Sequence, residues 1–149
     1  MVLYLLVTSI GFISALTFVN VTTENRPMGI QENYLGNEDD PEAKEMKFEK
    51  SEKQILNIIH THMLAVGMLF FILAFLFSLT PIEGFLRKLL LFEPLMSVLF
   101  TFGGIYLLWR GILWMKYVIM ISGLLMSASY VVSVGLILFW IFQGKGREI

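Results

Sequence analysis

Two histidines, His60 and His62, are the residues whose type and placement most suggest chemistry in this chain. They stand near the start of an unbroken apolar run that extends from Gln54 to Thr80. Such a run has the roughly 20 apolar residues that a helix needs to cross about 30 Å of hydrocarbon. Ionisable or metal-binding side chains are rare inside spanning helices and mark a functional site by default, although near a helix end the cost is small. The pair is therefore the leading candidate site.

The chemistry that these histidines would perform is ligation of a haem iron or a metal. Each residue of a helix advances by about 100°, so the two rings lie about 200° apart and cannot both ligate one metal from the same face. One ring could face into a helix bundle and ligate a b-type haem while the other reaches the membrane surface. Arg110 and Lys116 are expected at the same depth, where they could pair with haem propionates. The sequence thus predicts His60, His62, Arg110 and Lys116 as cofactor-binding residues, with the two histidines as metal ligands.

A purely structural role competes with this hypothesis. A histidine at the mouth of a span can simply hydrogen-bond a loop carbonyl or an interfacial carboxylate. Basic side chains near span ends extend to the membrane surface as anchors. A second axial haem ligand could come from Met63, Met68, Met115 or Met120, but methionine is also an ordinary filler of apolar packing. Both interpretations remain open from the sequence.

The composition is that of a membrane protein. Hydrophobic residues make up 56% of the 149 residues and charged residues only 15%, with a mean hydropathy of +0.73, whereas soluble domains carry about a quarter charged residues. With no cysteine, disulfides, thiolate metal sites, covalently attached c-type haem and cysteine nucleophiles are excluded. No basic run suggests nucleic acid. We find no nucleophile–base pair or phosphate-binding loop, so an enzyme is disfavoured and no catalytic residue is assigned.

The apolar segments predict four spans, at about residues 3–19, 55–80, 94–109 and 113–142. We therefore expect an all-α fold, a transmembrane four-helix bundle forming a single membrane domain over residues 1–149, with a long polar loop at 20–54 between helices 1 and 2. The first span lacks the basic start of a signal peptide, so we expect it to be retained, with cleavage as the alternative.

The connections carry further predictions. Helical periodicity over residues 42–54 predicts a charged helix that runs into the second span. Residues 82–92 are expected to form an amphipathic segment on the bilayer surface. Pro94 should then open the third span, with Glu93 beside the positive end of that helix.

Charge is concentrated in the loop at 20–54. Nine of the twelve acidic residues fall between positions 24 and 52. Arg87, Lys88, Lys145 and Arg147 favour cytoplasmic termini, which makes the acidic loop periplasmic in a bacterial inner membrane. The expected contacts are the lipid bilayer and other membrane subunits or a second copy of the chain.

Polar residues recur along the fourth span, at Ser122, Ser127, Ser129, Tyr130 and Ser133. Gly123 and Ser127 form a small-xxx-small pair that allows close helix contact. Because no acid is expected beside these residues within the membrane, we interpret them as packing groups. A transporter or channel is disfavoured for the same reason.

Three segments carry a resemblance to known proteins: GIQENYLGNE at 29–38, MKFEKS at 46–51, and His60-Thr61-His62. Together they resemble a pattern in small four-span membrane proteins of bacteria such as the Bacteroidetes, a likeness that covers about residues 27–80 and implies no activity. A second resemblance, at His60, His62 and Gly67, is to the histidine-bearing helix of haem-copper oxidase catalytic subunits and related haem proteins. It implies haem ligation by His60 or His62 but neither a copper site nor oxygen chemistry, because those proteins have more spans and more histidines.

Two functions follow as hypotheses. The first is a small integral membrane subunit that binds or flanks b-type haem, with an electron-transfer or accessory role in a respiratory-type membrane complex. The second is a cofactor-free scaffolding or assembly subunit that docks a partner through the acidic loop.

Overall fold

The computed structural model describes residues 1–43 and 45–143, and all the regular secondary structure within them is helical. The helices are α1 (Val2–Thr23), α2 (Pro27–Leu35), α3 (Glu52–Ser78), α4 (Gly84–Trp109) and α5 (Met115–Phe142). Four of them, α1, α3, α4 and α5, are long and apolar enough to cross a membrane. The prediction of an all-α fold is confirmed over the described residues, and the four long apolar helices are candidates for the four predicted spans. Lys145 and Arg147, used above to predict topology, lie outside the described residues.

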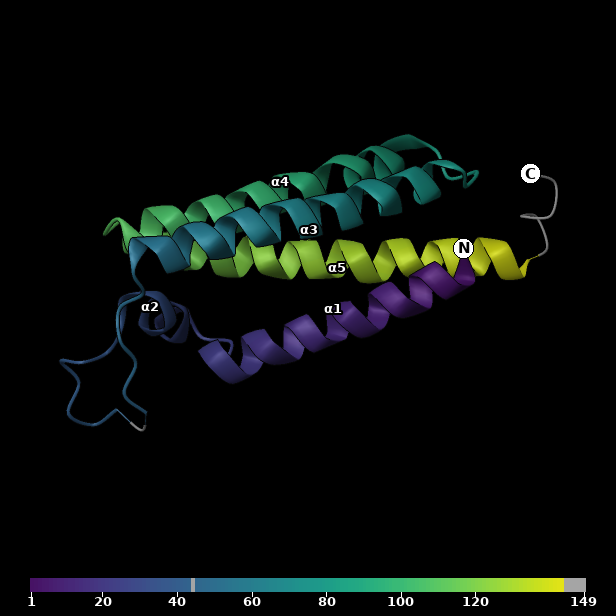
Figure 1. Cartoon of the computed structure of the whole chain (residues 1–149). Helices are drawn as coiled ribbons and strands as arrows, with labels where there is room; N and C mark the ends of the chain where they lie inside the picture. The colour runs from purple at the N-terminus through teal and green to yellow at the C-terminus, as the bar shows by residue number, and fades with distance from the viewer. Residues whose placement is uncertain (44, 144–149) are drawn as a thin grey trace.

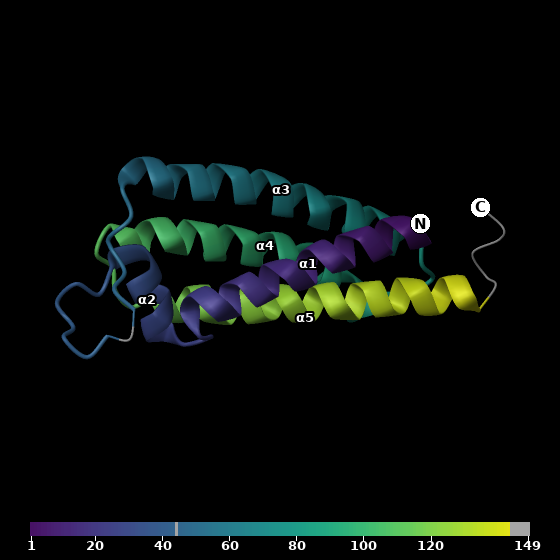
Figure 2. The same ribbon diagram turned by 60° about the horizontal axis from the view of Figure 1, so that its bottom comes forward.

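The long helices run side by side, and α2 lies across one end of them (Figures 1 and 2). The start of α1, the α3–α4 connection and the end of α5 lie at the opposite end (Figure 1). We call residues 24–51, which contain α2 and the loop after it, the cap. The cap and the α4–α5 turn therefore share one end of the bundle.

Helix α4 is the central helix of the bundle and packs against both α3 and α5. In the most apolar stretch of α4, 44% of the residues are buried, whereas in the corresponding stretches of α1 and α3 the buried share is 11%. Its core residues Phe102, Ile105 and Leu108 are all buried, and so are Phe70 of α3 and Ile137 of α5. The outer faces of the long helices are apolar and exposed, a pattern that suits contact with lipid rather than water.

The polar loop predicted at 20–54 contains the helix α2, which the sequence analysis did not anticipate. Pro27 occupies the first turn of α2, where its missing N–H costs no hydrogen bond. The predicted charged helix at 42–54 is wrong over most of its length, because α3 begins only at Glu52. Ser51 caps the start of α3 in a capping box. Its N–H donates to Gln54 Oε1 at 2.8 Å, and the Gln54 N–H donates to Ser51 Oγ at 3.4 Å.

The third long helix also differs from the prediction. Helix α4 begins at Gly84 and continues through Pro94, so the expected surface segment at 82–92 and the expected third span form one helix. Gly84 has φ +79°, a conformation that glycine adopts without strain, and this allows the sharp entry into the helix. Glu93 consequently lies inside α4 rather than before its first turn.

Candidate functional site

His60 and His62 both lie on α3 with exposed side chains. His62 Nδ1 is 2.8 Å from the carbonyl oxygen of Ile58, one turn earlier on the same helix. Its ring centroid is 5.5 Å from that of Phe102 on α4. Neither imidazole is enclosed by the bundle, and residues 1–43 and 45–143 contain no group of three or more histidine or acidic side chains placed to hold a metal. Both imidazoles are thus exposed in the single chain, and that of His62 lies beside Phe102 of α4.

The basic pair predicted beside the histidines has a different environment from the one expected. Arg110, the residue that follows the end of α4, has an exposed side chain. The ammonium group of Lys116 donates to Gln31 Oε1 at 2.8 Å and lies 3.2 Å from the sulfur of Met28. Lys116 therefore contacts α2, and its main polar contact joins the start of α5 to the cap.

The cap is attached to the bundle by a second contact at Trp109, the last residue of α4. The indole Nε1 donates to the backbone carbonyl of Lys50 at 2.8 Å. Lys50 in turn donates through Nζ to the carbonyl of Asn33 at 2.5 Å and lies 5.7 Å from the ring centroid of Tyr34. The end of α4, the residues before α3 and the end of α2 are thereby joined in one network.

Asn37 and Lys47 close the loop of the cap. The Asn37 N–H donates to the Lys47 carbonyl at 2.9 Å, and the Lys47 N–H donates to Asn37 Oδ1 at 2.6 Å. Gly36 has φ +82°, and a Cβ there would meet the Glu49 nitrogen at 2.8 Å, so only glycine fits. The Lys47 ammonium donates to the carbonyl of Thr22 at 2.9 Å, which ties the loop to the end of α1. Two segments that were singled out separately in the sequence, 29–38 and 46–51, are thus adjacent in space.

Burial in this network perturbs two titratable groups. Burial raises the pKa of the Tyr34 phenol to about 12, against a smaller lowering by its hydrogen bond with Asn33. Burial, and secondarily the charge of Lys47, lowers the pKa of the Lys50 ammonium. Tyr34 and Lys50 are both half-buried in this network.

The outer surface of the cap is acidic. A groove of about 580 Å³ is lined by five carboxylates, together with Gly36, Asn37 and Pro41 among others. The five are Glu32, Glu38, Asp39, Asp40 and Glu49. We call this feature the acidic groove. Lys116 contacts Gln31 and Met28 in the lining of this groove, so its charge offsets part of that of the five carboxylates.

A carboxyl group inside the bundle was missed by the sequence analysis. Glu93 of α4 accepts hydrogen bonds from two serine hydroxyls, Ser97 on its own helix at Oε1 and Ser129 on α5 at Oε2. The expectation that no acid accompanies the serines of the fourth span is therefore wrong. In the sequence, the i, i+4 spacing of Glu93 and Ser97 could have indicated the hydrogen bond between these two residues on one helix.

A comparison with protein families identifies the chain at the level of its architecture. The family model described as a transmembrane helical domain, Aq_1264_TM, matches residues 24–148. The chain belongs to this family. It is an integral membrane protein, which agrees with its four apolar helices. Neither a curated protein nor a solved structure matches the chain.

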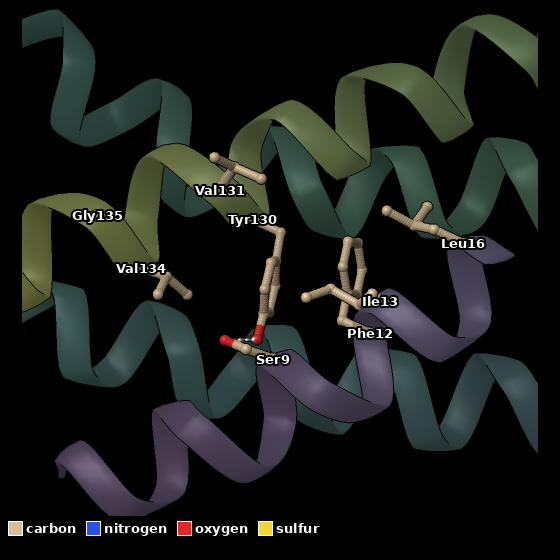
Figure 3. A pocket seen from close by; sticks show the side chains of 8 residues that line it. All are labelled: Ser9, Phe12, Ile13, Leu16, Tyr130, Val131, Val134 and Gly135. Carbon is tan, nitrogen blue, oxygen red and sulfur yellow. Dashed lines mark hydrogen bonds between the residues drawn. The ribbon is translucent and has the colours of Figure 1, made fainter.

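The family match comprises the cap and the helices from α3 to α5, and α1 precedes it. Helix α1 packs on the bundle with Leu5, which is buried, and with Phe12, whose ring stacks on Tyr130 of α5 with a centroid distance of 4.0 Å. Figure 3 shows the groove of about 260 Å³ between α1 and α5, with the hydroxyls of Ser9 and Tyr130 3.1 Å apart at one side. In this member of the Aq_1264_TM family, α1 also contacts the cap, through Lys47 Nζ and the Thr22 carbonyl.

Proposed function

We propose that this protein is an accessory membrane subunit that docks a partner protein through its cap. The observation that supports the proposal is the attachment of the cap to the bundle by Trp109 with Lys50 and by Lys116 with Gln31. A surface that is already ordered avoids the entropic cost of ordering a loop when the partner binds. The acidic groove is therefore presented in a fixed orientation relative to the membrane.

Charge complementarity defines the partner as a protein with a basic segment. Residues 24–51 contain eight acidic and four basic side chains, a net charge of −4. Two of the four bases, Lys47 and Lys50, are engaged with backbone carbonyls of the chain. Opposite charge on the partner would accelerate association and select it over acidic competitors.

A charge-neutral variant of the groove tests this function with less disturbance than a deletion. The triple variant Glu38→Gln, Asp39→Asn, Asp40→Asn changes three exposed side chains. We expect it to weaken binding of the partner by about 3- to 150-fold, and to reduce the recovery of the cross-linked partner from native membranes accordingly, because each of the three lost pairings contributes about 0.2–1 kcal/mol. The control variant Glu52→Gln, Glu83→Gln changes exposed acids outside the groove and outside the cap. Equal partner recovery from wild type, triple variant and control would contradict the docking function. Deletion of residues 29–50 should abolish recovery entirely.

Haem b ligation by His60 and His62 stays a second prediction. Both imidazoles are accessible from outside the bundle, so a haem here would lie between this chain and another subunit or a second copy. Arg110, whose side chain is exposed at the same end of the bundle, would be available to a propionate, whereas Lys116 would have to leave Gln31. Haem would supply one-electron transfer to a respiratory-type complex. The absorption spectrum of the purified protein tests this: a Soret band that His60→Ala with His62→Ala abolishes is expected. A spectrum without a Soret band, or a band that both substitutions leave unchanged, contradicts it.

We also propose that the termini are cytoplasmic and the cap periplasmic, in a bacterial inner membrane. Arg87 and Lys88 lie near the start of α4, at the end of the bundle opposite the cap, and basic residues favour the cytoplasmic side. Since the chain has no cysteine, Glu38→Cys and Glu83→Cys each introduce a single reactive thiol. A membrane-impermeant maleimide added to intact spheroplasts should label Glu38→Cys and spare Glu83→Cys. The reverse pattern would invert the topology.

A further inference from the structure

Glu93 is a carboxylic acid well inside a helix that is long and apolar enough to cross a membrane. At 1.5 Å per residue it lies about 24 Å along α4 from Trp109 at the cap end. Arg87 and Lys88, at the other end of α4, lie about 8 Å away along the axis by the same geometry. With roughly 30 Å of hydrocarbon measured from Trp109, the carboxyl group falls inside the apolar layer.

The surroundings of Glu93 are built from hydroxyl groups. Ser97 and Ser129 have only 3% and 7% of their surfaces exposed, and each contacts a different oxygen of the carboxyl group. A serine hydroxyl can donate to a carboxylate, and after rotation it can accept from the O–H of a carboxylic acid. The two serines can therefore serve both protonation states of Glu93 without a change of backbone.

No basic side chain neutralises Glu93 within the described chain. The one ion pair found in residues 1–43 and 45–143 joins Arg26 and Glu24 in the cap. Arg87, on the same helix as Glu93, donates instead to the carbonyls of Ser78 at 3.1 Å and Ile82 at 3.5 Å. Lys88, also on this helix, has an exposed side chain.

The helices packed around Glu93 add few titratable groups. From Met63 to its end, α3 carries no ionisable side chain. On α5 the nearest titratable group is Tyr130, and its hydroxyl is turned toward Ser9 and Thr8 of α1. On α1 the titratable side chain is Tyr4. A charged carboxylate in apolar surroundings with hydroxyl donors alone is costly, and the smallest change that neutralises it is the uptake of one proton.

We propose that Glu93, held by Ser97 and Ser129, is an intramembrane proton-binding site that takes up and releases one proton. The step is the association of the carboxylate with H⁺ to give the neutral acid. The serine at the protonated oxygen then turns to accept from the new O–H, while the other serine continues to donate to the carbonyl oxygen. This site is about two thirds of the bundle away from the cap, so it is independent of the docking function. A fixed structural link between α4 and α5 would instead keep one protonation state at every pH at which the protein is folded.

The hydrophobic reagent dicyclohexylcarbodiimide tests the proposal, because it enters the bilayer and reacts with protonated carboxyl groups. The acid adds across the carbodiimide to an O-acylisourea, which rearranges to a stable N-acylurea that mass spectrometry can locate. For the full chain in lipid vesicles, we expect an adduct at Glu93 whose rate of formation falls about tenfold per pH unit above the titration midpoint. Glu83→Gln, at an exposed position outside α4, should label like wild type, and Glu93→Gln should lose the adduct.

Three outcomes would overturn the proposal. The first is the lack of any adduct at Glu93 between about pH 5 and pH 9 in folded protein. The second is labelling at a rate that does not change with pH, which indicates a fixed structural link. The third is protection by Na⁺ but not by K⁺ at constant pH, which would assign the site to a metal cation. The wild-type measurement does not depend on whether Glu93→Gln folds, and Ser129→Ala offers a second variant in which the pH dependence should change while the adduct remains.

Discussion

The indole Nε1 of Trp109 donates a hydrogen bond of 2.8 Å to the backbone carbonyl of Lys50, a residue 59 positions earlier in the chain. Trp109 ends α4, and Lys50 lies just before α3 begins. This one contact joins the central helix of the bundle to the loop of the cap. It places an aromatic residue at the end of a span, where amphipathic rings are typically found in membrane proteins.

Replacing Trp109 with Phe should weaken this junction specifically. The variant keeps an aromatic ring but leaves the Lys50 carbonyl without its donor, so the free energy of unfolding in detergent micelles should fall by about 1–2 kcal/mol. Amide exchange over residues 45–51 should become faster. Trp114→Phe is the matched control, because the Trp114 side chain is 59% exposed. A similar loss in both variants would mean that the Nε1 contact contributes nothing specific.

Replacing Lys116 with Met should loosen α2 while the aliphatic part of the side chain is kept. The contact between the ammonium group and Gln31 Oε1 is lost, at a cost of about 1 kcal/mol. Amide exchange of α2 measures the effect, and a double-mutant cycle with Gln31→Leu isolates the pair. If the two single effects simply add, the contact carries no coupling energy.

Adding a methyl group at Gly29 should displace the cap from α1. A Cβ there would come within 1.9 Å of the Thr23 carbonyl oxygen, and a backbone atom cannot move away as a flexible side chain can. We expect Gly29→Ala to lower the free energy of unfolding by about 2–4 kcal/mol. Gly67→Ala in α3 is the control, because no atom lies within 4 Å of its Cβ, and the higher helix propensity of alanine should leave stability unchanged or raised by up to about 1 kcal/mol. Thermal unfolding of both variants in micelles distinguishes them, and equal melting temperatures would argue against the close contact.

Tyr34 should make the protein less stable in alkali. Burial raises its pKa from 10.0 to about 12, so the unfolded chain loses the phenol proton first and the folded state binds more protons across this interval. Stability contributed by Tyr34 is complete below pH 10 and is lost as the pH rises through about 12, by as much as about 3 kcal/mol. Unfolding of wild type and Tyr34→Phe at about pH 9 and pH 11 measures the difference. Tyr117→Phe, at a residue that is 53% exposed, should keep the wild-type alkaline loss.

Lys50 should change the stability of the protein with pH in the direction opposite to that of Tyr34. Its pKa is lowered from 10.5 by burial, so the folded state binds fewer protons than the unfolded chain as the pH approaches 10.5. Its contribution to stability therefore rises with pH over that interval. The Tyr34→Phe variant should reveal this rise once the loss from the phenol is removed.

The four apolar helices were predictable, whereas the ends of several helices were not. The apolar run that begins after Gln54 identifies α3 through its composition alone. By contrast, residues 42–51 have helical periodicity, but residues 45–51 lie in a loop, because Asn37 and Tyr34 accept hydrogen bonds from the backbone of Lys47 and Lys50. Local propensity was overridden there by contacts with a segment that is distant in the sequence.

For the candidate sites, too, some features were predictable from the sequence and others were not. The positions of His60 and His62 near the start of a span follow from hydropathy, but their exposure depends on which face of α3 meets α4. Glu93 was placed before a helix because proline usually opens one, and the structure continues α4 through Pro94 instead. The partner of Glu93 on α5, Ser129, is 36 positions away, so no local pattern indicated the pair.

The sequence by itself determined that this is an all-α membrane protein with four apolar helices. In lipid, the backbone N–H and C=O groups must bond to one another, and a helix of about 20 apolar residues achieves this within its own segment. Only the tertiary structure decided that Lys116 binds Gln31, 85 positions away, that Trp109 attaches the cap, and that Glu93 is paired with serines inside the bundle. These contacts depend on the rotation and register of packed helices. Helix packing sets that geometry through the shapes of many side chains at once, and no single segment of the sequence contains it.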